Sequence, residues 1–125
     1  MEDMKDMKVR LSTLWIFVMF NILAADIIGF LNTGALQTII EMKPASELLL
    51  VFSVLLELPI AMIVLSRVLP FLVNRYANII AGVITIVFII GGGSNILTYY
   101  FFAIIEVACL LLMIWYAARW TEHKA

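Results

Sequence analysis

The 125-residue sequence has little charge, and this shortage decides its class. Charged residues make up 14% of the chain, against about 25% in a typical soluble protein. The polar residues are confined to short stretches between long apolar runs, so most of the surface must face lipid. The sequence therefore predicts an integral membrane protein whose first partner is the bilayer.

Cysteine and histidine are equally scarce, with one residue of each kind. Cys109 lies inside an apolar run, which excludes a disulfide framework and a Cys-x-x-Cys redox pair. We interpret His123, in the polar C-terminal tail, as a solvated residue rather than a ligand. These counts predict no metal, no cofactor and no catalytic constellation, and hence no enzyme. The net charge of -1 offers no basic surface, so we expect no nucleic-acid partner.

Four apolar segments are each long enough to cross a bilayer as a helix, which takes about 20 residues. Breaks separate them at Asn32 to Gly34, at a linker from Gln37 to Glu47 that contains Pro44, at Pro70 followed by a polar turn of Asn74 and Arg75, and at Gly91 to Asn95. We predict a single all-α membrane domain over residues 1–125, with spans at about 11–31, 46–69, 76–90 and 97–120. Such short linkers give an up-down-up-down four-helix bundle.

Basic residues near the span ends predict the orientation of the bundle. On one side lie Lys5, Lys8, Arg10, Arg67, Arg75, Arg119 and Lys124. The other side carries only Lys43. Lys and Arg are enriched in the cytoplasmic segments of membrane proteins. The sequence therefore predicts a multi-pass protein of the cell membrane with both termini cytoplasmic.

Three acidic residues lie inside the spans, where an ionisable side chain at the bilayer centre costs about 2.5–3.5 kcal/mol. Asp26, Glu57 and Glu106 lie on three different helices, and at about 1.5 Å of rise per residue they reach similar depths. Asn21 lies about a turn and a half below Asp26, so we place both near the outer mouth of a site.

Small residues recur around two of these acids at helical spacing. In span four they follow the face of Tyr99, Ala103, Glu106, Cys109 or Leu110, Met113 and Ala117, and in span two that of Ser53, Glu57 and Ala61. Small residues let helices approach closely, so we expect Glu57 and Glu106 to face the bundle interior. Span three offers Asn78, Gly82, Thr85 and Gly92 but no acid, which predicts a packing helix.

Pro59 removes the amide that would bond to the Leu55 carbonyl, so we expect a kink or a loosened turn beside Glu57. The alternative is an ordinary membrane proline that only bends the helix. No basic residue lies at the depth of the acids, so we expect them to be protonated or to share protons at neutral pH. They then either bind a proton, a cation or an amine, or act as hydrogen-bonding links between helices.

Several segments resemble an uncharacterised family of small prokaryotic membrane proteins, the domain of unknown function six-three-two-six. These segments are Lys8 to Phe17, Leu58 to Met62, Leu65 to Leu69, Asn74 to Gly82, Ile105 to Cys109 and Ile114 to Ala117. The resemblance covers nearly the whole chain and implies a four-span fold, but no activity, substrate or cofactor. The layout is also similar to small multidrug-resistance transporters, which carry their key glutamate in the first span; this chain has Asn21 and Asp26 there.

Three functions compete at this point. The first is a proton-linked binding or carrier protein for a cationic or amphipathic small molecule, with Glu57 and Glu106 as the exchangeable acids. Carrier activity would require a homodimer, because one small bundle has little room for a translocation path. The second is an accessory subunit of a larger membrane complex, and the third an enzyme acting on a lipid through a carboxylic acid. A cavity between spans one, two and four would favour the first.

Overall fold

The computed structural model describes residues 2–31, 34–43, 46–91 and 97–120, and the secondary structure in these ranges is helical throughout. In chain order the helices are α1 (Glu2–Phe30), α2 (Ala35–Met42), α3 (Ser46–Val68), α4 (Phe71–Gly91) and α5 (Leu97–Arg119). All but α2 are long and apolar enough to cross a membrane. The predicted all-α fold with four apolar helices is confirmed. The predicted break residues Asn32, Thr33, Pro44 and Gly92 to Asn95, with His123 and Lys124 in the tail, lie outside the described residues.

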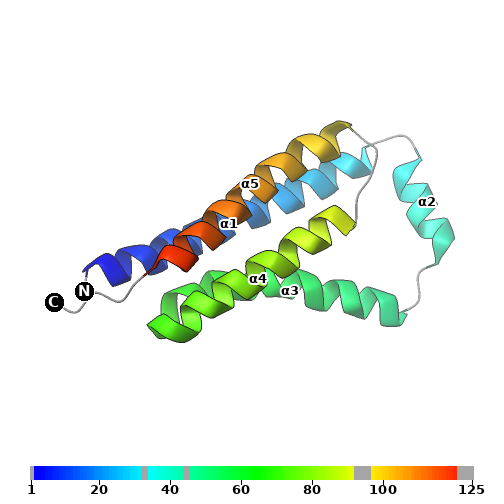
Figure 1. The fold of residues 1–125 in the computed structure, drawn as a ribbon. Coiled ribbons are helices and arrows are strands. Elements are labelled where there is room, and N and C mark those ends of the chain that lie inside the picture. Colours follow the sequence, from blue (N-terminus) through cyan, green and yellow to red (C-terminus); the bar gives the residue numbers. More distant parts are fainter. Residues whose placement is uncertain (1, 32–33, 44–45, 92–96, 121–125) are drawn as a thin grey trace.

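The four long helices form a ring in which α1 and α4 occupy opposite corners. Each of these two packs against both α3 and α5. The start of α1 and the end of α5 lie at the same end of the bundle, which we call the terminal end, whereas the short α2 lies across the opposite end, the α2 end (Figure 1). Consecutive long helices therefore run in opposite directions.

The connection between α3 and α4 is tighter than the sequence predicts. The predicted polar turn at Asn74 and Arg75 is wrong, because both residues lie inside α4. Pro70 precedes the helix, a position where its missing amide hydrogen is no loss. Asn74 Nδ2 donates to the carbonyls of Ser66 at 2.7 Å and Leu69 at 3.3 Å. It thereby occupies carbonyls at the end of α3 that would otherwise lack a partner.

A buried hydrogen-bond network joins α1, α3 and α4 in the terminal half of the bundle. Asn78 Oδ1 on α4 accepts from Trp15 Nε1 on α1 at 2.7 Å and from Ser66 Oγ on α3 at 3.3 Å. Asn78 Nδ2 donates to Asn74 Oδ1 at 2.6 Å and to the backbone carbonyl of Asn74 at 2.9 Å. All four side chains are fully buried. We call Trp15, Ser66, Asn74 and Asn78 the Asn78 network.

Two arginines hold the same half of the bundle from its edge. Arg67 Nε on α3 donates to Ser12 Oγ on α1 at 2.8 Å. Arg75 on α4 donates to the carbonyls of Ala117 at 3.0 Å and Ala118 at 2.9 Å, at the C-terminal end of α5. A cation at this position satisfies free carbonyls and complements the helix dipole.

Close packing of α4 against α5 depends on Gly82. A Cβ at this position would lie 2.9 Å from Ile114 Cγ1 on α5, so no larger residue fits without movement. Asn78, Gly82 and Thr85 are all buried, which confirms the predicted packing face of the third span.

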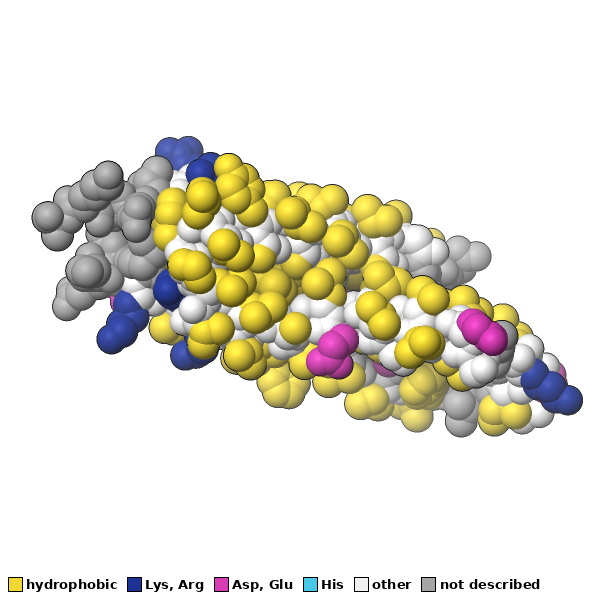
Figure 2. Space-filling view, turned by 90° about the horizontal axis from the view of Figure 1, so that it is seen from below, with side chains coloured by type: hydrophobic (Ala, Val, Ile, Leu, Met, Phe, Trp, Pro, Cys, Tyr) yellow, Lys and Arg dark blue, Asp and Glu magenta, His cyan; other side chains and the backbone are white. Residues whose placement is uncertain are grey.

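The bundle opens toward the α2 end. Every residue from 46 to 54 of α3 is exposed, and in Figure 1 this part of α3 diverges from α1 and α5. Hydrophobic side chains cover the middle of the face shown in Figure 2, with acidic side chains among them, while Lys and Arg gather mainly near one end. Lipid-facing helices in a membrane have such a surface.

We predict that Asn78→Leu lowers the free energy of unfolding by about 1–3 kcal/mol, because Trp15 Nε1 and Ser66 Oγ lose their buried acceptor. Denaturation of the purified protein in detergent micelles measures the change. Asn21→Leu is the matched control, since the Asn21 amide donates to the Phe17 carbonyl of its own helix at 2.8 Å. Equal losses in the two variants would contradict a special role for the network.

Candidate functional site

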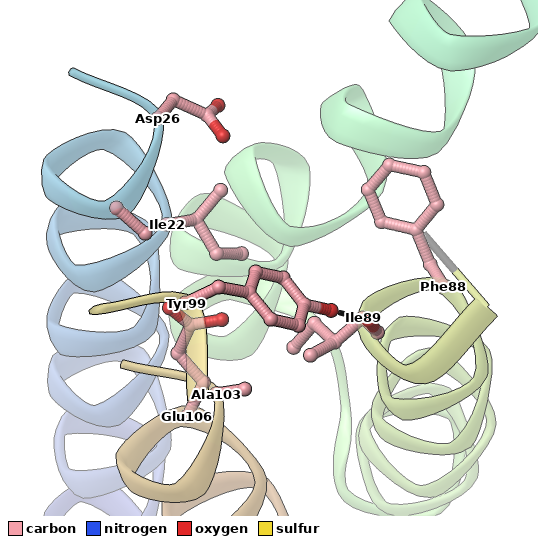
Figure 3. Close-up of a pocket in the computed structure, with 8 residues that line it drawn as sticks. Ile22, Asp26, Phe88, Ile89, Tyr99, Ala103 and Glu106 are labelled. Atoms are coloured by element: carbon pink, nitrogen blue, oxygen red, sulfur yellow. Dashed lines mark hydrogen bonds between the residues drawn. The ribbon is translucent and has the colours of Figure 1, made fainter. Parts of the chain in front are cut away.

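A pocket of about 140 Å³ lies between α1, α4 and α5 (Figure 3). It is lined by Ile22, Ala25 and Asp26 from α1, Phe88 and Ile89 from α4, and Tyr99, Ala103 and Glu106 from α5. A cavity of about 150 Å³ holds a benzene molecule, so this pocket accommodates a ligand of similar size.

The two acids occupy different levels of the pocket. Asp26 is exposed, four residues before the end of α1, and lies at the upper edge in Figure 3. Glu106 lies deeper, is 4% exposed, and its Oε2 atom is buried without a hydrogen-bond partner. The pocket thus leads from an accessible carboxyl to a buried one, of which one oxygen atom has no hydrogen-bond partner among the described residues.

Tyr99 forms one wall of the pocket by crossing from α5 to α4. Its hydroxyl donates to the carbonyl of Ile89, and Figure 3 shows its ring extended between the two helices. This hydrogen bond holds the Tyr99 side chain in place. Phe88 lies beside Ile89 on α4 and adds a second aromatic side chain. The walls are therefore mainly apolar and aromatic.

Helical spacing explains how α5 brings its three residues to the pocket. Tyr99, Ala103 and Glu106 follow steps of four and three, which places them on one face of a helix. Farther along the same face, Cys109, Leu110, Met113 and Ala117 are buried. The inward orientation predicted for Glu106 and its face is confirmed.

The inward orientation predicted for Glu57 is wrong. Glu57 and Ser53 are exposed on α3, and the buried side of that helix carries Pro59, Met62 and Ser66 instead. A pattern of small and polar residues indicates that one face of a helix packs against another helix. It does not tell whether that other helix belongs to the same chain. The helix also continues through Pro59 without interruption.

The pocket differs from the predicted cavity in two further respects. It is lined by the third long helix, α4, and not by the second, α3. Asn21 is not among the lining residues; its amide bonds within α1 and its side chain is half-buried. Of the four predicted site residues the structure brings together Asp26 and Glu106. Phe88 and Ile89 were missed, because nothing in the α4 sequence indicates which helix they would face.

The pocket is acidic and has no basic lining residue. The lysines and arginines of α3, α4 and α5 that the structure describes lie near the terminal end, at Arg67, Arg75 and Arg119. In the described part of the chain no group of three or more His, Cys, Asp or Glu side chains could hold a metal ion. The chemistry that the pocket offers is two carboxyl groups in an apolar, aromatic setting.

Four long apolar helices, three of which line an acidic pocket, define a helical protein of the multi-pass membrane class. The chain belongs to the family described as "Family of unknown function (DUF6326)", which matches residues 1–125. No curated protein and no solved structure matches the chain.

We predict that Glu106→Leu raises the free energy of unfolding of the ligand-free protein by about 1–3 kcal/mol, because a buried polar group without a partner is replaced by an apolar one. The same detergent denaturation assay measures the gain, and Asn78→Leu provides a contrast of opposite sign. If Glu106 linked helices through hydrogen bonds, its replacement would destabilise the protein instead.

Proposed function

We propose that the protein binds a small organic cation in the pocket between α1, α4 and α5, with Glu106 as the anionic partner. The observation that carries this proposal is the buried carboxyl of Glu106, which lines the pocket and whose Oε2 atom has no hydrogen-bond partner among the described residues. A buried carboxylate is costly unless it is paired, so a bound cation supplies what the fold omits.

The lining supports an organic cation of limited size. Alkyl groups of an ammonium ion fit against Ile22, Ile89 and Ala103. Phe88 and Tyr99 also line the pocket, and aromatic rings attract quaternary ammonium groups. A strongly hydrated inorganic ion would instead need several oxygen ligands.

Proton exchange follows from the same arrangement. In the empty pocket a proton neutralises the Glu106 carboxyl, and an arriving cation displaces it. Asp26 at the accessible edge attracts the cation, and Tyr99, whose hydroxyl is bonded to Ile89, is the other titratable group that lines the pocket. Passage of the cation across the membrane would require a second copy of the chain, because a single bundle has little room for its own path.

Orientation decides which compartment supplies the cation. We propose that the terminal end lies in the cytoplasm of a cell-membrane protein, because six of the seven described Lys and Arg residues lie toward it. They are Lys5, Lys8, Arg10, Arg67, Arg75 and Arg119. Lys43, next to α2, is the seventh. The Asp26 edge of the pocket then lies toward the outer side of the membrane.

Binding can be tested with tetramethylammonium by isothermal titration calorimetry on the detergent-purified protein. We expect Glu106→Gln to weaken binding about tenfold or more, a loss of about 1.4 kcal/mol, because the amide carries no charge. Asp26→Asn should weaken it less. Glu57→Gln is the matched control, because Glu57 is exposed on α3 and outside the pocket. Equal affinities in the parent and in Glu106→Gln would refute the proposal.

The affinity of the parent for tetramethylammonium should rise with pH, because protons and the cation compete for the same carboxyl. The Glu106→Gln variant has no such proton to displace, so its residual binding should depend less on pH. Release of protons on binding, measured by titration in buffers of different ionisation enthalpy, checks this directly. A parent profile that is flat with pH would contradict proton exchange at Glu106.

The proposed orientation can be tested by labelling single cysteines in intact cells with a membrane-impermeant thiol reagent. In a Cys109→Ser background, Gln37→Cys on α2 should be labelled and Lys5→Cys near the start of α1 should not. Both positions are exposed, so accessibility to water does not separate them. Labelling of both from outside would contradict the predicted topology.

A further inference from the structure

Glu57 occupies an unusual place on the lipid-facing surface. It lies eleven residues from each end of α3, whose bounds are Ser46–Val68, so it is at the middle of the span. At about 1.5 Å per residue, each end is about 16 Å away, too far for a glutamate side chain to reach water. The side chain is exposed, and none of the described residues bonds to it.

Lipid cannot satisfy this carboxyl, because hydrocarbon offers no hydrogen-bonding group. An unsatisfied polar group at this depth is costly, which favours cover of Glu57 by another molecule with polar groups. The exposed residues of α3 on either side of Glu57 indicate what kind of molecule this is.

The most exposed hydrophobic side chains of α3 lie in register with Glu57. They are Leu50, Val54, Val64 and Val68, which are 60–65% exposed, whereas the other exposed large hydrophobics of α3 reach at most 53%. With Glu57 and Ala61 they form a line of residues at alternating steps of four and three. We call Leu50, Val54, Glu57, Ala61, Val64 and Val68 the α3 seam.

This alternation is the heptad spacing of helices that pack side by side as a left-handed coiled coil. In such pairs a single polar residue at a central position sets the register. Ala61, one turn from Glu57, is small enough for two backbones to approach closely. The opposite side of α3, with Pro59, Met62 and Ser66, is buried in the chain's own bundle.

We propose that the α3 seam forms a symmetric interface with the α3 seam of a second copy of this chain, centred on the two Glu57 side chains. A two-fold axis brings the same residue of both copies together at the same depth. Two carboxyl groups that meet can hydrogen-bond to each other, so two Glu57 side chains satisfy each other without a third residue. A second copy therefore supplies the complement that the seam requires.

The interface is independent of the cation site. No residue of α3 lines the pocket, which lies between the other three long helices. Each copy of the dimer keeps its own pocket, and dimerisation can be tested without any ligand.

Disulfide cross-linking in native membranes tests the interface. In a Cys109→Ser background, Val64→Cys on the α3 seam should give a disulfide-linked dimer on oxidation, because a disulfide needs the two Cα atoms within about 7 Å. Leu111→Cys on α5 is the control, matched in exposure at 56% against 60% for Val64. It should stay monomeric. Equal cross-linking of both, no cross-linking of Val64→Cys, or its capture by a different protein alone would overturn the proposal.

The role of Glu57 is tested by resonance energy transfer between labelled chains in detergent. Glu57→Gln keeps a group that both donates and accepts, so its dimer should persist. Glu57→Leu should weaken dimerisation roughly tenfold, since the central hydrogen bonds are lost. Glu106→Gln should leave dimerisation unchanged, and Glu57→Leu should still bind tetramethylammonium, which separates this interface from the proposed cation site. Dimerisation of Glu57→Leu at parental strength would overturn the assignment of Glu57.

Discussion

The buried amide of Asn78 is the contact on which the bundle depends. Lipid is as apolar as the helix surfaces, so burial of apolar area gives little drive for helices to associate within a membrane. Polar groups in the interior supply the specificity instead. Asn78 accepts hydrogen bonds from α1 and α3 and donates to Asn74 on its own helix, so one side chain fixes three helices. The bonds of Arg75 to the end of α5 bring in the fourth.

These bonds are concentrated in the terminal half, and the other half is more open. There α3 diverges from its neighbours, and a pocket lies between α1, α4 and α5. Asn74 and Asn78 are buried with partners, whereas Glu106 is buried with its Oε2 unpaired. The unpaired oxygen of Glu106 is therefore the basis of the proposed cation site, whereas the paired amides have a structural role.

Much of the fold could be predicted because lipid imposes a strong constraint on the sequence. Long apolar runs define spanning helices, and helical spacing placed Glu106 on an inward face. Glu57 could not be placed in the same way. Its neighbours Ser53 and Ala61 are as small as those around Glu106, yet α3 turns that face outward. Asn74 and Arg75 resemble turn residues in sequence, but their side chains bond to the ends of α3 and α5 from inside α4.

The sequence by itself determined that lipid surrounds this protein, and it determined the number and approximate positions of its spans. It also identified the three acidic residues inside those spans. Each of these follows from local hydropathy and charge, which do not depend on how the helices pack. Only the tertiary structure decided that Asp26 and Glu106 share a pocket with Phe88 and Tyr99, and that Glu57 lies outside on the α3 seam. The rotation of each helix about its axis sets these neighbours, and that rotation is fixed by contacts between distant residues such as Trp15 and Asn78.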